Sequence, residues 1–132
     1  MTQIVAVLNT DAETLEGLAL ALGDAGFRAF TLNTVGTTRA EIAHFIGSVN
    51  PDVIVFDLGP PYTEAIRHWE ELRQARAAKG RPFVLTTTGR GLEIGCFGDI
   101  DTEIVEKPFS FSQLVRSVQR AARQCGHSQE HA

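Results

Sequence analysis

The stretch DVIVFDLGPP, residues 52–61, decides the fold of this chain. Its core, Val53–Phe56, is four consecutive apolar residues, a pattern typical of a strand buried on both faces of a parallel sheet. Asp57 and a Gly-Pro-Pro turn follow directly. A carboxylate at the end of so apolar a strand must be paired or solvated, because burying an isolated charge is costly. The stretch therefore predicts a central strand that carries an acid to the end of a sheet.

Short apolar runs alternate with helical patterns along the rest of the chain. Runs at 4–8, 27–32, 83–87 and 103–105 predict further strands, the second of them an edge strand. Between the runs, apolar residues recur at helical spacing, as at positions 15, 18, 19 and 22. Glycines at 89, 91, 95 and 98 predict a short or frayed helix before the last strand. This alternation favours an α/β fold, with a parallel sheet covered by helices on both faces.

Local signals predict where the helices begin and end. Thr10 with Glu13, and Ser110 with Gln113, are typical of capping boxes at the starts of the first and last helices. Gly80 is expected to close the third helix. The residues GHSQEHA, 126–132, are expected to form a flexible C-terminal tail after a domain over 1–125.

Composition excludes several classes of protein. A chain of 132 residues with 43% apolar residues is suited to one globular domain with a substantial core. A net charge of −4 argues against a nucleic-acid surface, and no apolar run reaches the roughly 20 residues that a membrane helix needs. The start MTQIVAV lacks the features of a signal peptide. Cys96 and Cys125 show no metal-ligand or disulfide spacing, so we expect reduced thiols in the cytoplasm.

Polar side chains follow four of the predicted strands. Asn9 comes after the first, Asp57 after the third, Thr87 at the end of the fourth, and Lys107 after the fifth. In open α/β sheets, ligands bind in the crevice outside the carboxyl ends of the strands. We therefore expect an acid, a hydroxyl and an amine to meet there.

Three segments together resemble the receiver domain of bacterial two-component response regulators: PDVIVFDLGPP (51–61), RPFVLTTTG (81–89) and IVEKPF (104–109). The similarity extends from Ile4 to about Arg123. It implies a flavodoxin-like, doubly wound five-stranded parallel sheet in the order 2-1-3-4-5. It also implies that Asp57 is the phosphoacceptor and that Thr87 and Lys107 bind the phosphoryl group, with Thr86 as an alternative to Thr87.

The resemblance implies partners and a cofactor as well. The phosphoryl group would come from a sensor histidine kinase, a phosphotransfer protein or a small phosphodonor, with Mg²⁺ at the acceptor. The signal would pass to a downstream protein target by protein–protein contact. Homodimerisation through the face of the fourth helix, fifth strand and fifth helix is possible in this family. The domain would be a cytoplasmic signalling module and not an enzyme, without nucleic-acid or membrane binding of its own.

The sequence departs from the family at the metal site and at one switch position. The family ends its first strand with two adjacent acids, where this chain has Leu8 and Asn9. Mg²⁺ prefers carboxylate oxygens in a near-octahedral shell, so we expect weak or absent binding. The remaining ligands would be Asn9, Asp57 and the backbone carbonyl of Gly59. Ile104 occupies the position of the family's aromatic switch residue.

Two interpretations of the acid at 57 remain open. Asp57 is either a phosphoacceptor or the fixed partner of Lys107 in a structural ion pair. The second interpretation describes a phosphorylation-independent pseudo-receiver that serves as a binding or dimerisation module. Asp11 is likewise either a replacement Mg²⁺ ligand or an acid that stabilises a helix N-terminus.

Other functions are disfavoured. Gly59 stands where an aspartate-nucleophile phosphatase would carry its second acid, and no G-x-G-x-x-G segment follows the first strand. His44, His68, His127 and His131 lack the context of a phosphotransfer domain, and we expect them to face solvent.

Overall fold

A computed structural model describes residues 2–94 and 102–131 of the chain, and the side chains of 2–91 and 102–123. The strands are β1 (Ile4–Asn9), β2 (Arg28–Asn33), β3 (Val53–Asp57), β4 (Phe83–Thr87) and β5 (Thr102–Glu106). The helices are α1 (Ala12–Asp24), α2 (Arg39–Val49), α3 (Tyr62–Gln74), α4 (Gly89–Ile94) and α5 (Phe111–His131).

The five strands form one sheet in the order β2-β1-β3-β4-β5, and every neighbouring pair is parallel. The chain moves outward from β1 to β2, crosses back to β3 and then moves the other way. The gap between the ends of β1 and β3 is therefore the topological switch point. The predicted α/β class, the flavodoxin-like order and the edge position of the second strand are confirmed.

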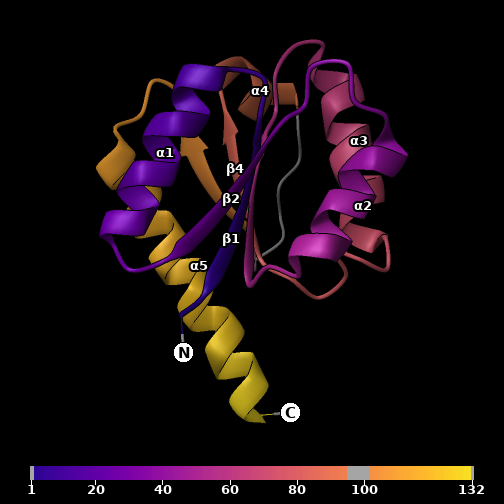
Figure 1. Ribbon diagram of the computed structural model, residues 1–132. Coiled ribbons are helices and arrows are strands. Elements are labelled where there is room, and N and C mark those ends of the chain that lie inside the picture. The colour runs from indigo at the N-terminus through magenta and orange to yellow at the C-terminus, as the bar shows by residue number, and fades with distance from the viewer. Residues whose placement is uncertain (1, 95–101, 132) are drawn as a thin grey trace.

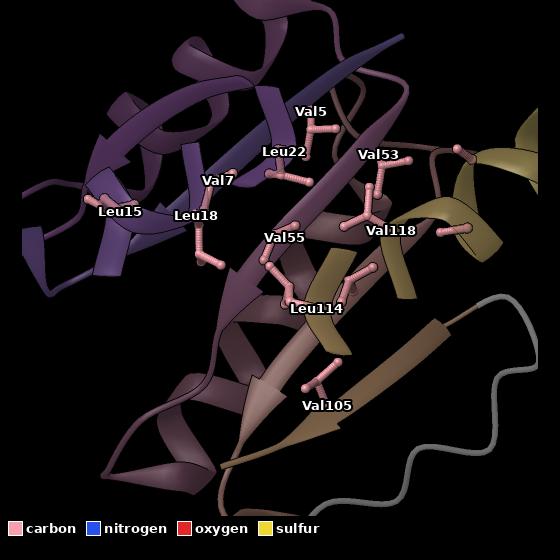
Figure 2. Packing of buried hydrophobic residues seen from close by; sticks show 13 residues of the cluster. Val5, Val7, Leu15, Leu18, Leu22, Val53, Val55, Val105, Leu114 and Val118 are labelled. Carbon is pink, nitrogen blue, oxygen red and sulfur yellow. The ribbon is translucent and has the colours of Figure 1, made fainter. Parts of the chain in front are cut away.

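Two helical layers enclose the sheet, with α1 and α5 on one face and α2 and α3 on the other (Figure 1). Side chains alternate between the faces along each strand. Val5 and Val7 of β1 pack with Val53 and Val55 of β3 in the cluster beneath α1 and α5 (Figure 2). Leu8 points the other way, into the cluster under α2 and α3. Burial on both faces is why the central strands are continuously apolar.

The start of α1 differs from the prediction. Asp11, not Thr10, is the N-cap, and its carboxylate accepts a hydrogen bond from the Thr14 N–H at 3.1 Å. The same carboxylate oxygen accepts from the Thr14 hydroxyl at 2.5 Å. A carboxylate at this position satisfies an orphan helix donor and carries a charge that favours the helix N-terminus, so the predicted Thr10–Glu13 capping box is wrong.

The end of α3 also differs from expectation, whereas the start of α5 is as predicted. The Ser110–Gln113 capping box is present in both directions, at 2.7 and 3.1 Å. α3 ends at Gln74, because Ala75 is extended, and Gly80, at a φ of +81°, lies in the following turns. The helix α5 is described as far as His131, and the flexible tail over 126–132 stays a prediction.

None of the helices in the described part of the chain is both long and apolar enough to cross a bilayer.

Candidate functional site

An ion pair lies at the carboxyl end of the sheet, where β3 and β5 deliver Asp57 and Lys107. The Lys107 Nζ is 2.5 Å from Asp57 Oδ1, and the two side chains are 32% and 10% exposed. The Thr86 hydroxyl donates a hydrogen bond to the same Oδ1 at 2.7 Å. One oxygen of the carboxylate therefore receives both a cation and a neutral donor. The predicted acid and amine meet here, together with a threonine hydroxyl.

The hydroxyl that touches Asp57 belongs to Thr86, the residue predicted as an alternative to Thr87. Thr86 is the register partner of Asp57 across the β3–β4 ladder. Thr87 is fully buried, and its hydroxyl has no hydrogen-bond partner within the described residues. Its backbone carbonyl accepts the Lys107 N–H at 2.6 Å. The predicted role of Thr87 as a phosphate ligand stays a prediction.

The second oxygen of Asp57, Oδ2, has no hydrogen bond to any described residue. Gly59 lies beside it: a Cβ at position 59 would be 3.8 Å from Oδ2. Asp57 also borders a cavity of about 180 Å³ between β1, β3, α3 and the β2–α2 connection, lined by Leu8, Thr34, Thr37, Ile42, Phe56, Ala65 and His68. Oδ2 is thus the carboxylate oxygen that Lys107 and Thr86 leave without a bond.

The residues predicted to hold Mg²⁺ fit that ion poorly. Asn9 is 7% exposed, and its Oδ1 accepts the Asp11 N–H at 2.9 Å. Leu8 is 1% exposed and belongs to the apolar cluster under α2 and α3. Asp57 is the one carboxylate among the predicted ligands, and its charge is already balanced by Lys107. The described residues contain no group of three or more His, Cys, Asp or Glu that could hold a metal ion.

Asp11 is occupied as a helix cap. Hydrogen bonds from the Thr14 hydroxyl, and then from its backbone N–H, lower the pKa of Asp11 below its ordinary value of 3.8. The carboxylate is therefore ionised and bonded within its own helix start. Of the two interpretations of Asp11, the structure supports the one in which it stabilises a helix N-terminus.

The expectation for His68 is wrong, because this side chain is half-buried on α3. Its ring meets Phe56 edge-on, with centroids 5.5 Å apart, and its Nε2 is buried without a hydrogen-bond partner in the described residues. Burial lowers the pKa of His68; Arg39 lowers it further, and Glu71 acts in the opposite sense. His44 is exposed, as predicted. The side chains of His127 and His131 lie outside the described residues, as do Cys96 and the Cys125 side chain.

We expect His68 to make the protein less stable in mild acid. The pKa of His68 is lowered in the folded state, so the unfolded chain binds the proton more readily. The free energy of unfolding should therefore be unaffected by His68 at neutral pH and should fall once the pH drops below about 6.5, the ordinary histidine value. Urea unfolding at pH 7.5 and 5.5 measures this.

The control for His68 is the exposed histidine on α2. His68→Gln should reduce the loss of stability between the two pH values, whereas His44→Gln should preserve it. The charged neighbours Arg39, Glu71 and Asp57 are present in both variants. Equal pH dependence in wild type and His68→Gln would contradict the assignment.

One further aromatic contact at the site was not predicted. Tyr62, the first residue of α3, places its hydroxyl 2.7 Å from the Thr88 hydroxyl, just beyond β4. Ile104, at the predicted switch position, is half-buried on β5 opposite Leu85. No signal in the sequence around Tyr62 indicates this contact, because it joins residues 26 positions apart.

Comparison with known proteins finds the same architecture in solved structures. The chemotaxis protein CheY4 of Vibrio cholerae is 20% identical, with a TM-score of 0.69, and the alignment covers 92% of this chain and 99% of that one. A response regulator receiver protein from Sinorhizobium medicae is 23% identical, with a TM-score of 0.67 and coverage of 94% and 97%. A structure described as a transiently phosphorylated "switch" in bacterial signal transduction is 23% identical, with a TM-score of 0.73 and the same coverage.

No protein-family model matches the chain, and no curated protein matches it. The likeness is therefore one of structure, at identities of 20 to 23%. It extends over nearly all of this chain and nearly all of each of those structures. This chain has the fold of the CheY-like receiver domains of bacterial response regulators.

Proposed function

We propose that this protein is a response-regulator receiver domain that accepts a phosphoryl group on Asp57 and signals by protein–protein contact. One observation carries the proposal: Oδ1 of Asp57 is held by Lys107 and Thr86, whereas Oδ2 accepts no hydrogen bond from a described residue. A carboxylate held in this way is positioned and has one oxygen available for reaction.

The reaction would be an in-line phosphoryl transfer. Oδ2 of Asp57 forms a bond to phosphorus while the bond from phosphorus to the donor's leaving group breaks. Positioning and charge stabilisation supply most of the catalysis in such transfers. Lys107 would provide the cation, and the hydroxyl of Thr86, or of Thr87 after a rearrangement, would donate to a phosphoryl oxygen.

The donor would be a phosphohistidine of a sensor kinase or phosphotransfer protein, or a small acyl phosphate. Mg²⁺ would bind weakly if at all, through Asp57, Asn9 and the Gly59 carbonyl. The protein would act in the cytoplasm, without enzymatic turnover of its own, on a downstream protein target. A homodimer through the α4–β5–α5 face belongs to the same proposal.

A second candidate function is a pseudo-receiver that binds a partner without phosphorylation. It is favoured by the burial of Leu8 where the family has an acid, and by the tight pairing of Asp57 with Lys107. Ile104 at the switch position favours it further.

Acetyl phosphate distinguishes the two functions. With millimolar donor and Mg²⁺, the intact mass of the wild-type protein is expected to rise by one phosphoryl group, and Asp57→Asn should remove the adduct. Asp24→Asn, the same change at the exposed end of α1, should keep it. If the wild-type protein is not modified, phosphorylation of Asp57 is ruled out and the pseudo-receiver function remains. An adduct that persists in Asp57→Asn would place the phosphoacceptor at another residue.

A further inference from the structure

The connection from β4 to α4 is held by a side chain from α3. The Tyr62 and Thr88 hydroxyls lie 2.7 Å apart, within hydrogen-bond distance. The same Thr88 oxygen accepts the Gly91 N–H at 3.3 Å, in the first turn of α4. Tyr62 therefore bonds to the residue that caps this short helix.

The first turn of α4 sits directly on Thr87 and Tyr62. A Cβ at Gly91 would lie 2.1 Å from the Thr87 hydroxyl oxygen and 3.1 Å from the Tyr62 ring. A Cβ this close to a buried hydroxyl would force the Thr87 side chain or the first turn of α4 to move, so glycine allows the approach without such a shift. The first turn of α4 also covers Thr87, whose hydroxyl is buried and has no hydrogen-bond partner in the described residues.

The β4–α4 connection is joined to the candidate site through Lys107. The carbonyl of Thr87 accepts the Lys107 backbone N–H at 2.6 Å, and the Lys107 ammonium is paired with Asp57. Contacts thus run from Tyr62 to Thr88, along the backbone to Thr87, and then through Lys107 to Asp57. Ordering any one of these groups limits the movement of the next.

We propose that Tyr62 is a positioning residue of the candidate phosphorylation site. It holds the β4–α4 connection over Thr87 and thereby fixes the backbone that places Lys107 beside Asp57. The inference rests on the proposed function for its effect on phosphorylation, whereas its structural part is independent of it. The contact comes from α3, while the aromatic switch position on β5 carries Ile104.

Hydrogen exchange tests the structural part. Tyr62→Phe keeps the ring and removes the hydroxyl. A hydrogen bond of ordinary strength, about 1 kcal/mol, corresponds to roughly fivefold in an opening equilibrium. The amides of Gly91 and Lys107 should therefore exchange about fivefold faster. Thr88→Val should give at least as large a change, because it also removes the acceptor of the Gly91 N–H. Thr88→Ser should keep wild-type exchange, and adding Tyr62→Phe to Thr88→Val should change little.

Thr63→Val is the matched control, since it removes a hydroxyl from the next, exposed residue of α3 and should leave exchange unchanged. Circular dichroism establishes that each variant is folded. If Tyr62→Phe does not fold, hydrogen exchange in Thr88→Val tests the proposal in its place. Unchanged exchange at Gly91 and Lys107 in the folded variants would overturn the proposal.

Beryllofluoride, a mimic of the phosphoryl group, tests the effect on the site. Its affinity should fall about fivefold in Tyr62→Phe and stay at the wild-type value in Thr63→Val. Faster exchange with an unchanged affinity would overturn the positioning role. If wild type binds no beryllofluoride, the proposed function fails, and exchange at Lys107 alone decides whether Tyr62 positions that residue.

Discussion

Replacing Asn9 with aspartate is expected to tighten Mg²⁺ binding about a hundredfold. The change adds one negative charge beside Asp57 in a crevice where Lys107 already balances the existing one. A unit charge a few ångströms from a cation is worth about 3 kcal/mol at an effective dielectric near 20, which is about two decades of affinity. One oxygen of the new carboxylate can keep the bond from the Asp11 N–H, while the other becomes free for the metal. Isothermal titration calorimetry measures the effect.

Asn33→Asp is the matched control for this change. Asn33 is the register partner of Asn9 at the end of β2, and it is exposed. Its substitution alters net charge equally but outside the candidate ligand set, so Mg²⁺ affinity should rise much less. Similar gains in the two variants would show that general charge, and not the site, controls binding. Leu8→Asp is less suitable, because Leu8 is 1% exposed and its loss would disrupt a core.

Replacing Lys107 with methionine is expected to lower the free energy of unfolding at neutral pH by about 2 kcal/mol. The change keeps most of the side-chain volume and leaves the Asp57 carboxylate, 10% exposed, without its cation. Fully buried pairs lose about 3–5 kcal/mol in such experiments, and this one should lose less because Lys107 is 32% exposed. Urea denaturation at pH 7 gives the value.

A double-mutant cycle separates the pair from the individual side chains. Asp57→Asn should be nearly neutral, since the partly exposed ammonium of Lys107 can be solvated. The combination with Lys107→Met should recover most of the lost stability, because no unpaired charge then remains. If Lys107→Met alone has no measurable cost, the pair contributes nothing to folding, and a purely structural role for Asp57 loses its basis.

Much of the fold was predictable because its signals are local or periodic. The apolar run Val53–Phe56 indicates burial on both faces, and the helical stripes indicate the layers that cover it. The order of polar residues after the strands was enough to predict that Asp57 and Lys107 lie close together, since all strands of a parallel sheet end at the same edge.

What the sequence could not predict depends on register and on contacts between distant residues. Choosing between Thr86 and Thr87 requires the β3–β4 pairing, and a shift of one residue turns the hydroxyl to the other face. The half-buried position of His68 depends on how α3 is rotated against Phe56. Thr10 and Asp11 are both residue types that favour the N-cap position. Because they are adjacent, the sequence does not show which of them caps α1.

The separation of the two apolar clusters by the sheet has a consequence for how this chain can vary. Leu8 fits the cluster under α2 and α3, while its neighbour Val7 packs under α1 and α5. Amino-acid substitutions in one cluster need compensating substitutions only in that cluster, since the effects of distant sites on stability are additive. Substitutions can therefore accumulate in the cluster next to Asp57, under α2 and α3, while the cluster under α1 and α5 stays unchanged.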